Sequence, residues 1–510
     1  MEVVKTPWQS KVLKTGYFIL ILSVIFLGTY TRIGPQLTRD YWIDEIWRIS
    51  EISNTFAYSN VTQPVNVGDF YLTKAVWSLL GEQEVTSRLV PCVASILTLI
   101  LLGWYSWNHF SPPVAVLITA IAATAPGMIE HGYEFKPYSL ETLMCVISLI
   151  VFSKRNARSR LRLPFQLFFL TLLIALAFST VPFLSFLFIF ALFSTLKESR
   201  SQLIKVGGLA ILLGLAVSSY RYVSFMTPLS AQHGMWKFWQ PYYLQDLEQV
   251  KFFVFDRLPE LLSWYVLPIP GLTQLPGLLV LVVTLLICTI SVLITLADRN
   301  SFFVWIFFPP LVMMLLAVFG KYPFGTRVSA FYYPILLLSL GYFVNQLYLY
   351  MSVRPKTLAP FLQVTILLSA SWFSFQWTPR ENPGAHKHIQ VSKELFRFLG
   401  KNGSEDDFIC LSGHARMLID YYGTSNKLPL DPPCELPAPR EPNKNELDEF
   451  IAELPATNGS YWFMAVHRDR GYELLKQELI RQGLSIQSDL RRPSSFLIQV
   501  KKTPTSPHPD

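Results

Sequence analysis

Long apolar runs constrain this 510-residue chain more than any other feature. Segments 17–31, 277–297 and 301–320 approach or reach the roughly 20 residues that cross a hydrocarbon core about 30 Å thick. Hydrophobic side chains make up 51% of the sequence and charged ones only 15%, against about 25% charged in an ordinary soluble protein. This composition excludes a large water-soluble enzyme, a disordered chain, collagen and a disulfide-stapled miniprotein. It predicts an α-helical polytopic membrane protein.

The basic residues predict the orientation of the spans. Lysines precede the first apolar run, no small-residue cleavage site follows it, and the segments 154–162, 197–205 and 350–357 are rich in Lys and Arg. Because much of the net charge of +8 lies beside spans, it indicates topology, and no nucleic-acid partner is expected. We expect about eleven transmembrane helices, with the N-terminus in the cytoplasm and the C-terminus outside. The expected spans are 17–33, 89–107, 113–129, 138–153, 164–180, 182–197, 203–223, 271–297, 301–320, 328–349 and 357–377; the pair 164–180 and 182–197 has a re-entrant hairpin as its alternative.

A change of composition after Trp377 divides the chain into a transmembrane module, 1–377, and an extracytoplasmic α/β domain, 378–510. In the second part we expect helices at 388–400, 414–422, 443–454 and 471–482, and strands at 407–412, 461–467 and 495–500. Cys410 and Cys434 are both predicted to lie outside, where they either form a disulfide or leave Cys410 as a buried thiol.

The first external connection, 34–88, is far longer than a joint between spans requires. Apolar residues at helical spacing after Asp44 predict an amphipathic helix on the membrane surface, and a second such helix should end at Gly81. Asp44 and Glu45 fall in the first turn and point about 100° apart, so they have different roles. Either they only favour the positive end of the helix, or a carboxylate at the lipid boundary serves as a general base.

Two further external segments carry ionisable residues. The connection 130–137 brings Glu130 and Glu134 close to Lys136, which either pairs with Glu134 or binds an anion such as a lipid phosphate. Arg327 follows a tight glycine-containing turn at the head of a span, where it either snorkels to the interface or binds a ligand.

In order, these segments resemble the polyprenyl-phosphate-dependent glycosyltransferases of the C superfamily, the group with the protein O-mannosyltransferases and the aminoarabinose transferase of lipid A. The resemblance covers roughly the first 340 residues. It rests on Trp42-Ile43-Asp44-Glu45-Ile46-Trp47, on the segment from Tyr71 to Arg88, on Glu134-Phe135-Lys136-Pro137-Tyr138-Ser139-Leu140, and on Phe324-Gly325-Thr326-Arg327 followed by Phe331 and Pro334.

The resemblance implies an inverting transfer of a hexose or pentose from a polyprenyl phosphate to an acceptor hydroxyl at the outer membrane face. It assigns the role of catalytic base to Asp44, with Glu45 beside it in the site. It assigns the binding of the donor phosphate to Lys136 and Arg327. Glu130, Glu134 and Tyr138 complete the expected substrate-binding residues. Lys136 stands where an arginine is usual, and 63–69 replaces a His/Pro-rich stretch.

The expected partners are a lipid-linked sugar donor, membrane lipids, and an acceptor that is a lipid, a polysaccharide, a protein or a small molecule. The expected location is the plasma (inner) membrane, with the active site facing outside. No metal ligand or cofactor is assigned, although Asp44, Glu45, Glu130 and Glu134 are candidates for a divalent cation site. The alternative functions are a transporter or flippase of lipid-linked sugars, and an oligosaccharide ligase or polymerase.

Overall fold

The computed structural model describes residues 7–34, 40–41, 43–53, 67–153, 239–265, 276–297, 311, 313–320, 323–325, 327–352, 365, 368–369, 372, 392–423, 426, 428, 434–437, 444–466, 471–492 and 495–502. The chain forms two compact units. One unit comprises residues 1–36 and 51–381, and the other comprises 37–50 and 382–510.

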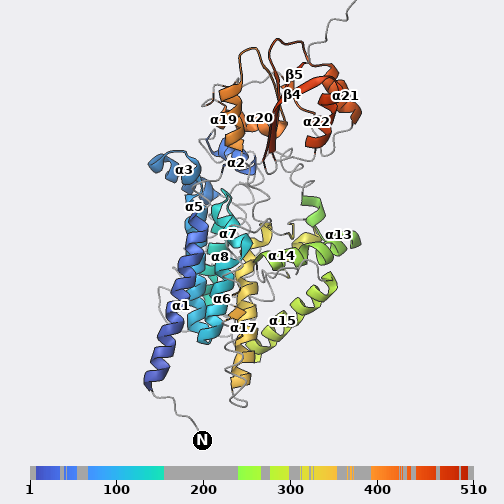
Figure 1. Cartoon of the computed structure of the whole chain (residues 1–510). Helices are drawn as coiled ribbons and strands as arrows, with labels where there is room; N and C mark the ends of the chain where they lie inside the picture. The colour runs from blue at the N-terminus through green and yellow to red at the C-terminus, as the bar shows by residue number, and fades with distance from the viewer. Residues whose placement is uncertain are drawn as a thin grey trace, which may run out of the picture. The chain divides into compact units, whose positions relative to one another are not determined.

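The first unit is helical (Figure 1). Its helices are α1 (Pro7–Ile33), α3 (Val67–Leu80), α4 (Glu84–Ser87), α5 (Leu89–His109), α6 (Pro112–Thr124), α7 (Pro126–Tyr133), α8 (Tyr138–Ser153), η3 (Gln240–Tyr242), α13 (Leu247–Phe252), the π-helical turn η4 (Phe253–Arg257), α14 (Leu258–Tyr265), α15 (Gly277–Ala297), η6 (Arg327–Tyr332) and α17 (Tyr333–Ser352).

Within the described residues, four helices are long and apolar enough to cross a membrane, and a fifth span is obtained if the bent pair α6–α7 counts as one. The chain is therefore a polytopic membrane protein. Exposed apolar side chains such as Phe26 on α1 and Leu293 on α15 form the kind of surface that lipid covers. Three expected spans, 164–180, 182–197 and 203–223, and most of 301–320 and 357–377, lie outside the described residues.

The core of this unit surrounds α6, which packs against α1, α5 and α17. Nearly every residue of α6 is buried, as expected for a helix that is apolar on all sides. Gly28 of α1 permits the close approach, because a Cβ there would lie 2.6 Å from the Leu99 side chain and 2.8 Å from Ala123 Cβ.

The expected span 113–129 is divided between two helices. α6 ends at Thr124, α7 begins at Pro126, and their axes differ by 49°. The physical reason is Pro126, which has no N–H to continue the hydrogen-bond ladder and whose ring clashes with the preceding turn. α7 then runs to Tyr133, so Glu130 lies on a helix and not in a surface loop.

The second unit contains α19 (Ser392–Asn402), α20 (Gly413–Tyr422), α21 (Lys444–Ala452) and α22 (Tyr472–Arg481) around a five-stranded sheet in the order β2-β1-β3-β5-β4. Its strands are β1 (Phe408–Leu411), β2 (Cys434–Glu435), β3 (Tyr461–Val466), β4 (Leu484–Arg492) and β5 (Ser495–Lys502); β1 is parallel to β2 and β3, whereas β5 is antiparallel to β3 and β4.

The central strand β3 is buried along its whole length because helices cover both faces of the sheet (Figure 1). Phe463 packs with Leu447 of α21 and Leu475 of α22, while the Trp462 ring contacts Phe398 of α19 on the opposite face. Such coverage explains why the strand is an unbroken apolar run and not an alternating one.

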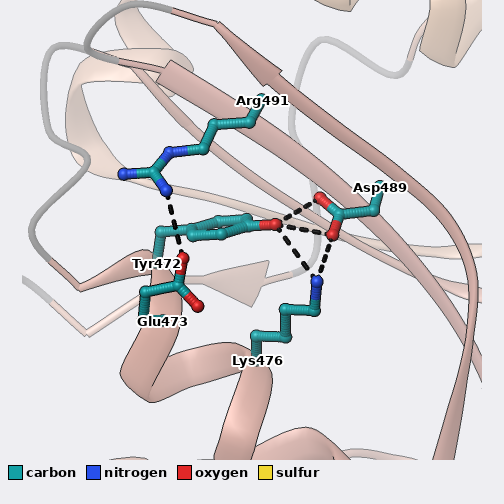
Figure 2. Close-up of polar contacts among 5 residues, drawn as sticks. All are labelled: Tyr472, Glu473, Lys476, Asp489 and Arg491. Carbon is teal, nitrogen blue, oxygen red and sulfur yellow. Dashed lines mark hydrogen bonds and ion pairs between the residues drawn. The ribbon is translucent and has the colours of Figure 1, made fainter.

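Polar contacts attach the edge strand β4 to α22 (Figure 2). The Tyr472 hydroxyl donates to Asp489, whose carboxylate also accepts from Lys476 Nζ at 2.6 Å. The Arg491 guanidinium stacks on the Tyr472 ring, 4.7 Å from its centroid, and donates to Glu473 at 3.0 Å. Each charge in this group has a partner of opposite sign, so the group is structural.

Candidate active site

The residues expected at the site are divided between the two units. Asp44 and Glu45 belong to the unit that contains the C-terminal domain. Glu130, Glu134, Lys136, Tyr138 and Arg327 belong to the helical unit.

Asp44 and Glu45 occupy the first turn of α2 (Ile43–Ser53), as the sequence predicts. The two carboxylates differ in burial: Asp44 is half-buried, whereas the exposed fraction of Glu45 is 0%. Ile46, Ile49 and Ile52 are buried by protein along one face. Of the two carboxylates, Asp44 is the one with surface available for a substrate.

In the helical unit, α7 and the turn after it bring four expected residues together. Glu130 and Glu134 are only 3% and 5% exposed, and Lys136 and Tyr138 are half-buried in the turn and at the start of α8. The backbone N–H of Lys136 donates to the Glu134 carbonyl at 2.7 Å, which closes the turn tightly.

His131 completes this cluster. Its Nδ1 lies 3.2 Å from Glu134 Oε2, and its ring centroid lies 4.9 Å from that of Tyr138. A buried imidazole oriented by a carboxylate can hold or move a proton. His131 was not among the residues expected at the site. Its separation of three residues from Glu134, which places both on one helical face, was the signal in the sequence that could have indicated it.

Arg327 begins η6, which packs against α7 and α8. The backbone therefore brings this residue to the same part of the helical unit as Glu130 and Lys136, while its side chain lies outside the described residues. Gly325, two residues earlier, lies against the Tyr242 ring, which a Cβ at that position would meet at 2.6 Å.

Arg32 at the end of α1 donates to the last turn of α6, just before the break to α7, and has no exposed surface. Its guanidinium donates to Ser95 Oγ at 2.8 Å and to the Gly28, Ala122 and Ala123 carbonyls at 2.7, 3.0 and 3.0 Å. The Ala122 carbonyl is the acceptor that residue 126 would use in a continuous helix, and proline cannot donate to it. Arg32 thus supplies the donor that the break removes. A basic residue at a span end indicates only topology in the sequence, so this role was missed.

Other ionisable side chains in the helical unit are also buried. Asp69, Arg88 and Glu141 are 2%, 0% and 5% exposed. Among the described residues, no group of three or more His, Cys, Asp or Glu side chains is arranged to hold a metal ion.

No family model matches the sequence, and no curated protein matches it. Two solved structures to which the chain is similar are those of ArnT from Cupriavidus metallidurans, in the apo state and bound to undecaprenyl phosphate. Each has a TM-score of 0.48 and 10% sequence identity; the alignments cover 95% of this chain and 98% and 97% of the two ArnT chains.

Proposed function

We propose that this protein is a membrane glycosyltransferase of the C superfamily. It transfers a sugar from a polyprenyl-phosphate donor to an acceptor hydroxyl, with inversion at the anomeric carbon. The observation that carries the proposal is the first turn of α2, which offers Asp44 at its surface and buries Glu45 completely. A general base needs this access to a substrate, whereas a buried neighbour fixes the position of the helix.

The proposed reaction is a single displacement. The acceptor oxygen forms a bond to the anomeric carbon, Asp44 takes the proton of the acceptor hydroxyl, and the bond from the anomeric carbon to the phosphate oxygen breaks. Polyprenyl phosphate leaves with the electron pair of that bond. Lys136 and Arg327 balance the charge on the leaving phosphate. Glu130, Glu134 and Tyr138 bind the sugar or orient these cations.

A second observation supports an external location for the C-terminal domain. Cys410 and Cys434, which are partners in neighbouring strands, are joined by a disulfide. Of the two alternatives expected for these cysteines, a disulfide or a buried Cys410 thiol, the disulfide is therefore the one observed. Disulfides persist mainly outside the reducing cytoplasm. We place the protein in the plasma (inner) membrane with its active site facing outward.

A donor panel tests the proposal. The protein, reconstituted in phospholipid nanodiscs, is mixed with polyprenyl phosphates that carry labelled hexoses or pentoses. Lipid, polysaccharide, protein and small-molecule fractions serve as acceptors, and the release of polyprenyl phosphate is measured with and without EDTA. Release with at least one donor supports the proposal, and loss of that release in EDTA identifies a divalent cation as a requirement. Absence of release with every donor contradicts it.

One observation favours the alternative, a transporter or flippase of lipid-linked sugars. The break between α6 and α7 places the buried Glu130 and His131 within six residues of a 49° bend, and transporters build substrate sites from interrupted helices with buried ionisable residues. Proteoliposomes distinguish the two functions, since a transporter moves an intact labelled lipid between leaflets without cleaving the sugar from its phosphate.

A further inference from the structure

The segment that leads into α2 is part of the C-terminal unit, although more than three hundred residues separate the two in sequence. Residues 37–50 group with 382–510. Asp44 and Glu45 therefore belong to the same compact unit as the five-stranded sheet.

Asp40 makes the first of two anchoring contacts. Its Oδ2 accepts the backbone N–H of Lys393 at 2.8 Å, across 353 positions of the sequence. Lys393 is the second residue of α19, where backbone N–H groups have no partner within the helix. A carboxylate at this end also interacts favourably with the positive pole of the helix dipole. Asp40 therefore caps α19 from a distant part of the chain.

Tyr41 makes the second contact, since its backbone N–H donates to the hydroxyl oxygen of Tyr422 at 3.0 Å. Tyr41 is 4% exposed and Tyr422, the last residue of α20, is 5% exposed. The Tyr422 ring is itself held between α19 residues, with Phe396 at 5.9 Å between centroids and Lys393 Nζ at 5.8 Å from its centroid.

These two contacts restrict the positions of Asp44 and Glu45, because only a few residues separate them from Asp40 and Tyr41. Asp44 is three residues after Tyr41, a distance of about 10 Å even for fully extended chain. Glu45, Arg48 and Ile49 of α2 are buried as well. The start of α2 is thus held by its own buried face and by two hydrogen bonds from the C-terminal domain.

We infer that the C-terminal domain positions the general base, with Asp40 and Tyr422 as the positioning residues. The inference rests on the proposed function of Asp44. It gives the domain a part in catalysis beyond acceptor binding or stability.

Two variants remove the contacts. Tyr422→Phe deletes the hydroxyl oxygen and keeps the ring, and Asp40→Ala deletes the cap of α19. Both should lower kcat about tenfold or more while KM for the donor stays unchanged, because small displacements of a catalytic group are costly. Asp40→Asn retains an oxygen that can cap a helix and should recover part of the lost kcat.

Tyr472→Phe is the matched control. It also deletes a hydrogen-bonded hydroxyl from a buried tyrosine of the same domain, in the group attached to β4 (Figure 2). Amide hydrogen exchange of the peptide 37–50 gives a readout that does not depend on activity. Exchange should accelerate in Tyr422→Phe and Asp40→Ala, and remain at the wild-type rate in Tyr472→Phe.

The outcomes separate this inference from the proposed function. If Asp44→Asn is inactive but Tyr422→Phe and Asp40→Ala keep wild-type kcat, or if their exchange is unchanged, positioning by the C-terminal domain is wrong and the role of Asp44 stands. If the wild-type protein transfers no sugar, the proposed function fails and positioning of a base fails with it, even where the exchange data confirm the anchoring.

Discussion

Arg32 Nη2 donates to the carbonyl oxygen of Ala122 at 3.0 Å, the acceptor that Pro126 leaves without its helical donor. The contact joins the end of α1 to the break between α6 and α7. It explains how a chain within the membrane can interrupt a helix, where a carbonyl without a donor costs several kcal/mol. The buried residues Glu130 and His131 depend on this break for their position.

Arg32→Met should therefore destabilise the protein by about 3 kcal/mol or more, because it removes donors from buried acceptors. Adding Pro126→Ala restores a backbone N–H that can donate to the Ala122 carbonyl. The stability lost in the double variant should therefore be smaller than the sum of the losses in the two single variants. Thermal unfolding in detergent measures both. Lys251→Ala, which removes an exposed ion pair, is the control and should change little. Additive losses would contradict the role of Arg32 at the break.

Two glycines of α1 provide a matched test of helix packing. A Cβ at Gly28 would lie 2.6 Å from Leu99 Cδ2, whereas a Cβ at Gly16 would have nothing within 4 Å. Gly28→Ala should destabilise the protein by about 1–3 kcal/mol. Gly16→Ala should be neutral or slightly stabilising, because alanine is the better helix former. Equal unfolding temperatures for the two variants would show that α1 does not pack on α6 as described.

Loss of the Cys410–Cys434 disulfide should destabilise the C-terminal domain. The bond closes a loop with a sequence separation of 24, for which loop entropy alone gives about 3 kcal/mol. Cys410→Ser should lower the unfolding temperature, while Cys288→Ala, which changes a cysteine outside any disulfide, should not. Labelling of Cys434 in whole cells only after reduction would agree with an oxidised, external domain; labelling without reductant would contradict it.

Asp407 should make the stability of the C-terminal domain depend on pH. Burial alone would raise the pKa of Asp407, but hydrogen bonds from the N–H of Ser460, the Trp462 indole and the N–H of Ser404 outweigh it and lower the pKa. A lowered pKa stabilises the fold above about pH 4, the ordinary value for aspartate, and this contribution is lost as the pH falls through the folded-state pKa.

The unfolding transition of the C-terminal domain, followed by calorimetry, should therefore shift to lower temperature between about pH 5 and pH 3 in the wild type. In Asp407→Asn the unfolding temperature should be lower than that of the wild type at neutral pH, and it should fall less as the pH decreases. An identical pH dependence in both proteins would rule out Asp407 as its source.

Local chemistry predicted much of the fold. The acidic first turn of α2, the end of α3 before Gly81 at φ +82, and strands β1, β3 and β5 are all at the expected places. Each depends on a signal within a few residues, such as apolar periodicity or a glycine at a helix end. Strand β4 was missed because it is an edge strand whose side chains are mostly polar.

Long-range partners could not be predicted. The backbone N–H of Lys393 donates to Asp40, and Arg32 donates to the carbonyl oxygen of Ala122. Both contacts join residues that lie tens to hundreds of positions apart in the sequence. The same limit applies to the candidate site. Asp44, Glu45, Glu130, Glu134 and Lys136 were chosen by residue type and neighbourhood, and His131 became apparent only when α7 placed it beside Glu134.

The turnover of Asp44→Asn shows whether Asp44 is the general base. Sugar release from the donor identified in the panel is compared among the wild type, Asp44→Asn, Asp44→Glu, and Glu51→Gln, which lies two turns later on the same helix. We expect Asp44→Asn to lose at least about a hundredfold in kcat, Asp44→Glu to keep part of the activity, and Glu51→Gln to resemble the wild type. Wild-type turnover in Asp44→Asn would show that Asp44 is not the general base.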